Sequence, residues 1–417
     1  MIKNPEHNFD VIVVGGGASG MMAAGMSASL GKNVLLIEKN RELGKKLKIT
    51  GGGRCNITNA EYDTRALLKN YGDAEQFLYS SFSQFGVKET FEFFEKRGLP
   101  LVVQARKRAF PHTEKAADVF RVLDKYIKKG NVHIKINSVV AKIVKNKNKI
   151  TGIQVGRDTY TAHSYILSTG GSSHAETGST GDGFKWLGDL GHTVKSPTPT
   201  IVPIRVEDEW IKSLSGTSIP STRITFYAEG KKKFSKTGKL LFTHFGLSGP
   251  LILNSAGAVD DLLQEGKVTA KIDLFPDNDE ARLEKKILKV FDENKNKMFK
   301  NILGEIVPKG TTDAVLSLLR DPAVAETKVH SVSRDARKNL IATLKAMPVT
   351  IAGLMGFDRA VVADGGVDLS EIDTKTMRSK LFDNLFITGD LLHINRPSGG
   401  YSLQLCWTTG YIAGKNA

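Results

Sequence analysis

The chain has 417 residues and 40% hydrophobic content, enough for a large core in about two or three domains. Its two cysteines, Cys55 and Cys406, lie far apart and in no CxxC pair, which excludes a disulfide framework, a zinc ribbon and a redox dithiol. We expect no metal site. The net charge of +15 favours either a solvated surface that keeps the protein soluble or a surface for a polyanion, for which RNA is the best fit.

Residues 11 to 38 contain the most informative pattern. Val11 to Val14 form an apolar run, Gly15 to Gly20 a glycine-rich turn, Met21 to Leu30 a small-residue stretch, and Asn33 to Glu38 a second apolar run with an acidic end. This order predicts strand, turn, helix and strand, which together form a dinucleotide-binding unit. Within the turn, the first glycine permits a tight bend, the second lets a pyrophosphate approach the backbone, and the third lets the helix pack on its strand.

Two further features of this unit suit a dinucleotide. The helix N-terminus presents free N–H groups and a positive dipole end to the phosphates. Glu38 follows Gly20 by eighteen residues, at the end of the second strand, where its carboxylate can accept hydrogen bonds from the ribose hydroxyls.

Residues Val11 to Gly31 carry no charge and are long enough to resemble a membrane span. Three consecutive glycines and the preceding Asp10 argue against a span. Residues Met1 to Asp10 lack the cationic start, apolar core and cleavage site of a signal peptide. We therefore expect a cytoplasmic protein with no membrane partner.

The next part of the chain alternates helical and strand patterns. Residues 63–98 and 118–129 are expected to be mainly helical. Val132 to Ile136, Ser138 to Val144 and Ile150 to Val155 predict a strand meander. Tyr165 to Ser168 is expected to be a short strand that ends in Thr169-Gly170-Gly171.

From Ser196 to Met347 the composition changes: Pro197, Pro199 and Pro203 open the segment, and short β-rich runs and then a helical pattern follow. We interpret 196–347 as an insertion, with a β-barrel at about 196–275 and helices at about 279–345, that covers the cofactor. The flanking segments, 1–195 and 348–417, then form one nucleotide-binding domain. Among the basic clusters we select Lys231 to Lys233 for RNA binding, because we expect them in a β-turn just before Thr243 to Pro250.

Three later features favour a flavin over a nicotinamide dinucleotide. Thr169-Gly170-Gly171 would let the backbone return close to the dinucleotide. Gly389-Asp390 ends a second strand with a carboxylate that can hold the hydroxyls of a ribityl chain, which NAD does not have. Gly399-Gly400-Tyr401-Ser402 opens a helix whose N–H groups can stabilise the negative charge of a reduced flavin.

Four segments carry a resemblance to a known family: Lys46 to Asn59, which contains Gly-Gly-Gly-Arg-Cys-Asn, Thr243 to Pro250, Gly365 to Val367 and Lys375 to Leu381. In these segments the chain resembles the BaiN/RdsA-type (YhiN-like) flavoproteins, NAD(P)/FAD-dependent oxidoreductases. The resemblance covers essentially the whole chain. It implies an α/β fold, with a Rossmann-like FAD-binding domain of the glutathione-reductase or fumarate-reductase type, interrupted by an inserted β-barrel and a helical segment.

The chain departs from the family pattern at two places. Gly389-Asp390 replaces the more frequent Gly-Glu, and the last helix reads Tyr-Ser-Leu-Gln-Leu-Cys-Trp from Tyr401, which can alter the flavin face or the choice of substrate. The residues expected to bind FAD are Gly15, Gly16, Gly17, Ala18, Ser19, Gly20, Glu38, Lys39, Lys46, Gly53, Arg54, Cys55, Asn56, Val140, Thr169, Gly170, Gly171, Gly389, Asp390, Gly400, Tyr401 and Ser402.

Two residues are candidates for catalysis. His244 lies in a glycine-bounded segment, where a loop can reach the flavin, and its pKa range suits proton transfer at neutral pH. Cys55 follows Arg54, whose charge would favour a thiolate. The alternatives are a hydrogen-bonded structural histidine and a small buried side chain beside FAD.

The sequence leaves the reaction open. It shows no second nucleotide-binding unit, so NAD(P)H is expected to act as a transient donor of hydride to an unidentified acceptor. Substrates linked to the family include steroid enones, a small amino ketone and a uridine of ribosomal RNA, so reduction of a C=C bond is our first hypothesis. The alternatives are a flavin oxidase or dehydrogenase of a small amine or ketone, and a flavin-containing RNA-binding module without its own catalytic role.

Overall fold

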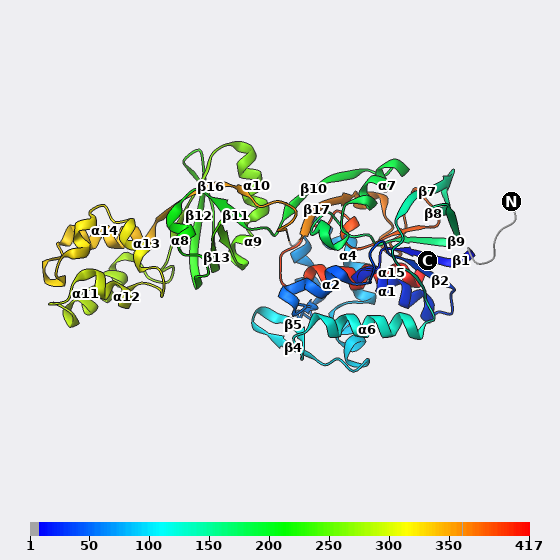
Figure 1. Ribbon diagram of the computed structural model, residues 1–417, viewed down its shortest axis with the longest axis horizontal. Coiled ribbons are helices and arrows are strands. Elements are labelled where there is room, and N and C mark those ends of the chain that lie inside the picture. The colour runs from blue at the N-terminus through cyan, green and yellow to red at the C-terminus, as the bar shows by residue number, and fades with distance from the viewer. Residues whose placement is uncertain (1–7, 361) are drawn as a thin grey trace. The chain divides into compact units, whose positions relative to one another are not determined.

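The computed structural model describes residues 8–360 and 362–417 (Figure 1). They form two compact units, which are described separately. Unit 1 comprises the residues up to Thr198 and those from Val361, and unit 2 comprises Pro199–Ala360. Most of the segment examined for a signal peptide lies outside the described residues, as does Val361.

Unit 1 is built on a seven-stranded sheet in the order β6-β2-β1-β9-β8-β7, with β18 also paired to β9. Five strands are parallel: β1 (Asn8–Val14), β2 (Val34–Ile37), β6 (His133–Lys135), β9 (Asp158–Leu167) and β18 (Leu385–Ile387). Strands β7 (Val140–Asn146) and β8 (Lys149–Val155) are antiparallel. The Rossmann-like α/β fold predicted from the sequence is therefore confirmed.

The predicted strand meander is wrong at its first strand. Residues 133–135 form β6, which pairs in parallel with β2 at the sheet edge, and the meander consists of β7, β8 and β9. A short apolar strand can pair at the edge of the parallel sheet or within the meander, and tertiary packing decides which strand it pairs with.

Helix α1 (Ala18–Ser29) explains why an uncharged stretch follows the glycine turn. Nine of its residues are buried, and α15 (Tyr401–Asn416) packs closely along it. A side chain on Gly410 or Gly414 would overlap the backbone of Ser19 or Ala23 on α1, so the close packing requires glycine at these two positions of α15. Within the described part of the chain, no helix combines the length and apolar character needed to cross a membrane.

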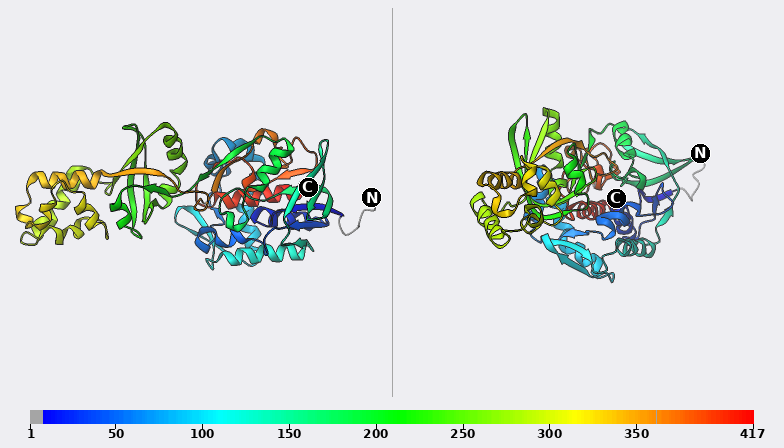
Figure 2. Two further views of the ribbon diagram at one scale, coloured as in Figure 1. Left: turned by 45° about the horizontal axis from the view of Figure 1, so that its top comes forward. Right: turned by 60° about the vertical axis from the view of Figure 1, so that its left-hand side comes forward.

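The remaining elements of unit 1 surround this core (Figures 1 and 2). A small sheet, β3-β5-β4, lies between helical segments. The bounds are α2 (Lys45–Ile49), β3 (Thr58–Asn59), α3 (Thr64–Leu68), α4 (Glu75–Gln84), α5 (Val87–Glu95), β4 (Leu101–Gln104), β5 (Arg108–Pro111), α6 (Ala116–Lys129), α7 (Asp182–Leu190), β10 (Val194–Thr200) and β17 (Val362–Val367). Strands β10 and β17 pair with each other, where the chain leaves and re-enters unit 1.

Unit 2 contains a closed barrel in the order β11-β14-β13-β12-β15-β16. Its strands are β11 (Ile204–Val206), β12 (Ser218–Ala228), β13 (Lys231–Thr243), β14 (Gly246–Ser248), β15 (Val268–Asp273) and β16 (Met347–Leu354). The domain boundary predicted at residue 347 is wrong, because β16 closes the barrel against β11 and the unit continues to Ala360.

Seven helices of the described chain belong to unit 2. They are α8 (Glu209–Ser213), α9 (Pro250–Leu253), α10 (Ala256–Glu265), α11 (Glu280–Glu293), α12 (Phe299–Ile306), α13 (Thr312–Ser317) and α14 (Arg334–Lys345). Helix α11 buries Leu283, Ile287 and Phe291 at four-residue spacing, and the Asp279 side chain caps its N-terminus. Both figures show α11 to α14 grouped together beside the barrel strands.

Candidate dinucleotide-binding site

Unit 1 contains a cavity at the carboxyl ends of its parallel strands, where ligands bind in open α/β sheets. The cavity brings together residues from the glycine turn, α2, the end of β9, the loop before α7 and the first turns of α15. Its walls are formed by Gly15, Gly16, Gly17, Ala18, Ser19, Glu38, Asn40, Gly44, Lys45, Lys46, Leu47, Thr50, Ser168, Thr169, Gly170, Thr177, Gly178, Ser179, Val362, Asp390, Ser402, Leu403 and Cys406.

The glycines of the first turn serve different needs. Gly15 has a φ of +104°, and a Cβ atom there would lie 2.5 Å from the Ser168 carbonyl oxygen. A Cβ atom on Gly20 would overlap the Gly15 carbonyl oxygen. Gly17 is different, since its φ of −82° suits any residue and no atom of the described chain lies within 4 Å of an added Cβ. The chain itself does not require glycine at position 17, and the open space beside it is what a pyrophosphate needs.

Glu38 closes one side of the cavity. Its Oε2 accepts a hydrogen bond from the Gly16 backbone N–H at 2.7 Å, and its Oε1 accepts from the backbone and side chain of Asn40. A second, smaller cavity also contacts Glu38, together with Lys39, Val140 and Trp186. The structure therefore brings Val140 beside Glu38, as expected for the adenosine end of a dinucleotide.

A charged group also lines the main cavity. The Lys46 ammonium donates a hydrogen bond to Ser173 Oγ at 2.6 Å and lies 3.9 Å from Asp390 Oδ2. Asp390 also forms an ion pair with Arg396, which donates a further hydrogen bond to Ser402 Oγ at 3.1 Å. These contacts fix the Asp390 carboxylate between the end of β18 and the first turn of α15.

The electrostatic balance keeps this carboxylate charged. Burial alone would raise the pKa of Asp390, but the Arg396 and Lys46 charges hold it below its ordinary value. Burial lowers the pKa of Lys46, against the opposing effect of Asp390. An ionised Asp390 accepts hydrogen bonds, which suits the hydroxyl groups of a ribityl chain.

Two further observations show that the cavity wall suits a polar ligand. The Thr169 hydroxyl is buried at the cavity wall without a hydrogen-bond partner in the described chain. The first turn of α15 contributes Ser402 and Leu403, so the positive end of the helix dipole faces the cavity. Gly400, with a φ of +103°, lets this turn contact the backbone of Thr58 on β3.

Several residues expected at the site do not line either cavity. These are Gly20, Gly53, Arg54, Cys55, Asn56, Gly171, Gly389, Gly400 and Tyr401. Gly20, Gly171, Gly389 and Gly400 instead lie in backbone close to the wall, where added side chains would meet neighbouring atoms. Gly53 is the last residue of the glycine-rich segment that follows α2, and Tyr401 is the first residue of α15.

The thiolate expected at Cys55 is not supported by its surroundings. The side chain is fully buried, and burial raises the pKa of the thiol to about 12. The guanidinium of Arg54 is directed elsewhere, because it pairs with Glu114 and lies over the Phe110 ring. Cys55 is therefore neutral at physiological pH, which contradicts a catalytic thiolate and leaves the small packing role.

The other predicted functional residues lie in unit 2. His244 is exposed, in the two-residue turn between β13 and β14. Lys231 to Lys233 are also exposed, and they form the beginning of β13, directly after a turn at 229–230. His244 lies at the other end of this strand, directly after its last residue. Ten strand residues, 234–243, separate the cluster from this turn, a distance of about 36 Å at the usual rise. The expectation that Lys231 to Lys233 lie just before the His244 loop is therefore wrong.

Sequence reasoning missed several parts of the site. Asn40 hydrogen-bonds Glu38, Ser173 accepts a hydrogen bond from Lys46, and Arg396 donates to Asp390. No motif around Asn40, Ser173 or Arg396 marks them as part of a site. The loop Gly178 to Gly183 also borders the site. Gly178 and Ser179 line the cavity, and α7 begins at Asp182.

Comparison with known families and structures decides the relationship. The model of the family described as "HI0933-like protein Rossmann domain" matches residues 9–416. The chain belongs to this family. Over 97% of this chain and 98% of the relative, it is 29% identical to the 3-dehydro-bile acid delta(4,6)-reductase of Clostridium scindens. It is 28% identical to the ribosomal RNA dihydrouridine synthase of Escherichia coli, over 98% of each chain.

Solved structures show the same fold as this HI0933-like chain. The 3-ketosteroid-delta4-(5alpha)-dehydrogenase from Rhodococcus jostii RHA1 matches with a TM-score of 0.53 and 14% identity, over 100% of this chain and 97% of that chain. A flavocytochrome c3 fumarate reductase in an open conformation matches with a TM-score of 0.51 and 18% identity, over 99% and 78% of the two chains. At these identities the likeness concerns the fold alone.

Proposed function

We propose that this HI0933-like protein is an FAD-dependent oxidoreductase that reduces a C=C bond conjugated to a carbonyl group. The observation that carries the proposal is the open space beside Gly17, in a cavity that continues from Glu38 to Asp390. A nicotinamide dinucleotide would also fit the residues around Glu38, because it has an adenosine ribose and a pyrophosphate too. The charged group at Asp390, next to the first turn of α15, matches the ribityl chain and the electron-rich edge of a flavin better.

Each part of the cofactor would have a named set of partners in unit 1. Glu38 would hold the adenosine ribose, with Val140 beside the adenine. Gly17 and the N-terminus of α1 would bind the pyrophosphate. Asp390 would accept hydrogen bonds from the ribityl hydroxyls, and the first turn of α15 would stabilise negative charge on the pyrimidine edge. When bound, the flavin supplies hydride transfer.

The choice of C=C reduction is supported by the names of two relatives. One is called a delta(4,6)-reductase of a 3-dehydro-bile acid, and another a ribosomal RNA dihydrouridine synthase. Dihydrouridine differs from uridine by a saturated C5–C6 bond, and that bond is conjugated to a carbonyl, as is the alkene of a 3-oxo steroid. Both names therefore describe addition of a hydride and a proton to an enone-type bond.

The protein's own groups would bind and orient the substrate and supply the proton. Cys406 and Cys55 are poor proton donors, because burial raises the pKa of each thiol to about 12. His244, exposed in the β13–β14 turn, is our candidate donor. NAD(P)H is the proposed electron source, entering the same site before the acceptor.

Cofactor release and an acceptor screen test the proposal. Acid release and chromatography of the purified protein should yield FAD and no FMN. The holoprotein should oxidise NADH or NADPH, and the reduced flavin should be reoxidised anaerobically by a 3-oxo-4-ene steroid or by a uridine-containing RNA. RNA mass spectrometry on a deletion strain should reveal any lost dihydrouridine. A protein without flavin, or one reoxidised only by oxygen with stoichiometric peroxide, would contradict the proposal.

A further inference from the structure

The small sheet β3-β5-β4 connects a basic turn to the start of α15. Arg108 lies opposite Asn59 in the pairing of β5 with β3. The Asn59 side-chain amide donates to the carbonyl oxygens of Arg106, at 3.3 Å, and of Gly399, at 3.4 Å. One side chain therefore joins the turn at residues 104–108 to the glycine turn that precedes α15, whose first residues line the candidate flavin site.

Nearby acidic residues neutralise only some of the positive charges in this area. Lys107 forms an ion pair with Glu61. Arg54 forms an ion pair with Glu114, which also accepts a hydrogen bond from Gln104. These pairs use the local carboxylates.

The two remaining cations, Arg106 and Arg108, are uncompensated. In residues 8–360 and 362–417, neither guanidinium has an ion-pair or hydrogen-bond partner. Arg108 is half-buried, and its pKa is lowered by burial and then by the charge of Arg106. Arg106 is exposed, so the repulsion between the two charges costs most at Arg108, where partial burial adds to it. A bound anion would remove both penalties.

Resting on the reductase function proposed above, we infer that Arg106 and Arg108 form an oxyanion subsite for the substrate, beside the flavin end of the cavity. A pair of guanidinium groups binds phosphate and carboxylate oxygens through the same charge-assisted hydrogen bonds. The oxyanion is therefore either a phosphodiester of a nucleic-acid substrate or the carboxylate of a small enone. The subsite holds the substrate at a point away from the bond that is reduced.

A matched pair of double variants tests the subsite in the full-length holoprotein. The test variant is Arg106→Gln with Arg108→Gln. The control is Lys147→Gln with Lys149→Gln, which removes the same charge at the same spacing from the exposed β7–β8 turn of the same unit. Lys147 has a positive φ of 52°, close to the 61° of Arg106, so the backbone is matched as well.

Three probes separate the sources of the anion. A labelled oligouridylate is measured by fluorescence anisotropy, and a 3-oxo-4-ene steroid carboxylic acid and its methyl ester by perturbation of the flavin spectrum. The arginine variant should keep its FAD but bind at least one anionic probe about tenfold more weakly. For oligouridylate, the salt dependence of log K should also become shallower by about 1.4, the value for two single-strand phosphate contacts. The methyl ester and the control variant should show no change.

The outcomes are distinct. Weaker binding of oligouridylate identifies a phosphate, and weaker binding of the acid relative to its ester identifies a carboxylate. Three results would overturn the subsite. The arginine variant could bind both anionic probes as tightly as the wild type does, or the lysine control could lose as much affinity as the arginine variant. The third such result is that the wild type binds neither anionic probe. A holoprotein that binds a probe through these arginines but reduces no C=C bond would instead contradict the proposed function.

Discussion

Arg396 and Asp390 form an ion pair in which only 1% of the arginine side chain and 15% of the aspartate side chain are exposed. The pair connects the end of β18 to the first turn of α15, because Arg396 also bonds Ser402 and the carbonyl oxygen of Ile394. The carboxylate of Asp390 thus has a fixed orientation before any ligand binds, with Oδ2 directed toward Lys46.

Removing one partner of this pair should be costly. Asp390→Ala leaves the buried Arg396 charge without its carboxylate and should lower the free energy of unfolding by about 3 to 5 kcal/mol. Replacing both residues, with Asp390→Leu and Arg396→Met, should recover much of that loss and still abolish tight FAD binding. Urea unfolding of the apoproteins and FAD titration measure the two effects. A loss below about 1 kcal/mol in the single variant would contradict a buried pair.

Gly17→Val should separate cofactor binding from folding. Position 17 has an ordinary φ and open space around an added Cβ, so the apoprotein should unfold at nearly the wild-type temperature while the pyrophosphate is excluded. Flavin content after reconstitution should fall to background. Gly20→Ala is the control, because its Cβ would overlap the Gly15 carbonyl and destabilise the apoprotein itself. Normal FAD binding by Gly17→Val would contradict the proposed pyrophosphate position.

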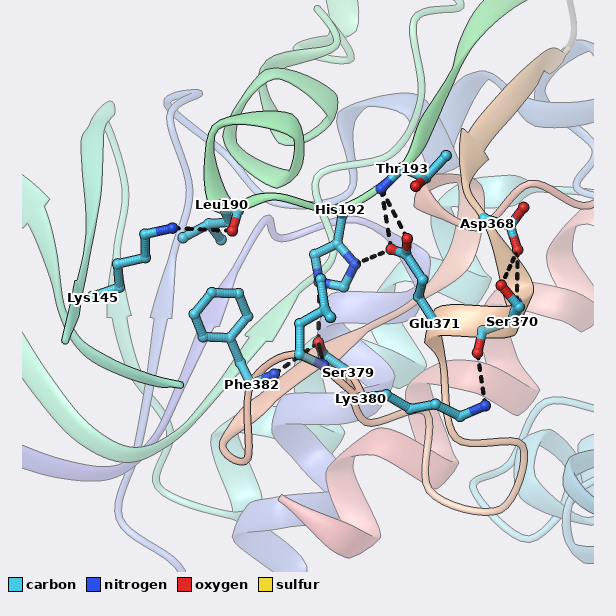
Figure 3. A network of polar contacts seen from close by, with 11 residues as sticks. Lys145, Leu190, His192, Thr193, Asp368, Ser370, Glu371, Ser379, Lys380 and Phe382 are labelled. Atoms are coloured by element: carbon cyan, nitrogen blue, oxygen red, sulfur yellow. Dashed lines mark hydrogen bonds and ion pairs between the residues drawn. The ribbon is translucent and has the colours of Figure 1, made fainter. Parts of the chain in front are cut away.

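A buried histidine predicts acid sensitivity of unit 1 (Figure 3). His192 Nδ1 lies 2.6 Å from Glu371 Oε2, and Nε2 lies 3.0 Å from Ser379 Oγ, which accepts hydrogen bonds from the N–H groups of Leu381 and Phe382. The serine hydroxyl must therefore donate to Nε2, which requires a neutral imidazole. Burial lowers the pKa of His192, against the opposing effect of Glu371.

The direction in which pH changes the unfolding free energy follows from the difference between the folded and unfolded pKa of His192. The unfolded chain takes up the histidine proton at a higher pH than the folded chain does. The contribution of His192 to stability is complete above the unfolded pKa of about 6.5 and is lost as pH falls through the folded pKa. His192→Gln should flatten the fall in unfolding free energy below pH 6.5. His163→Gln, at a histidine side chain that is 80% exposed, should leave that slope unchanged. Equal slopes for all three proteins would refute this account.

His244→Gln should spare FAD content and flavin reduction by NAD(P)H but slow reoxidation by the true acceptor. The reason is that a hydrogen-bonding but non-titrating side chain would replace the proposed proton donor in the β13–β14 turn. Stopped-flow measurement of the two half-reactions distinguishes the steps. An unchanged reoxidation rate would assign His244 to a structural role.

Replacing Lys231, Lys232 and Lys233 with Gln tests the RNA prediction made from the basic clusters. If these exposed lysines contact RNA, the dependence of log K on log salt should become shallower by about 2 for a single strand. Filter binding of ribosomal RNA fragments across a salt series measures this slope. Wild-type slopes in the variant, with flavin binding intact, would leave the lysines as a solvated face; Lys233 already pairs with Glu265.

The local part of the site could be predicted from the sequence, because its signals are contiguous. The segment Gly15 to Glu38 specifies its own turn, helix and strand, and Glu38 then contacts Gly16 within the same unit. The end of β18 and the start of α15 are equally local. The site residues that could not be predicted owe their role to contacts with residues distant in the sequence or to burial in the folded protein. Arg396 is one arginine among many until its burial against Asp390 is known.

The wrong expectations have the same origin. The charge of Arg54 lies next to Cys55 in the sequence, but the Arg54 guanidinium bonds Glu114 and Gln104, while the thiol is buried. Adjacent side chains need not share an environment. Strand β16 follows the helices of unit 2, so its sequence position gives no sign that it completes the barrel.

The division of unit 1 into two segments has a consequence for the order of events during synthesis. Residues 199–360 emerge from the ribosome as one contiguous stretch, so the barrel and its helices can fold as soon as they are made. Unit 1 must wait, because β18 and α15 are synthesised after unit 2 and α1 lacks its packing partner until then. Asp390 and the first turn of α15 belong to that late segment. We therefore expect cofactor capture to be a late step, because α1 has an uncovered apolar surface until α15 has been made.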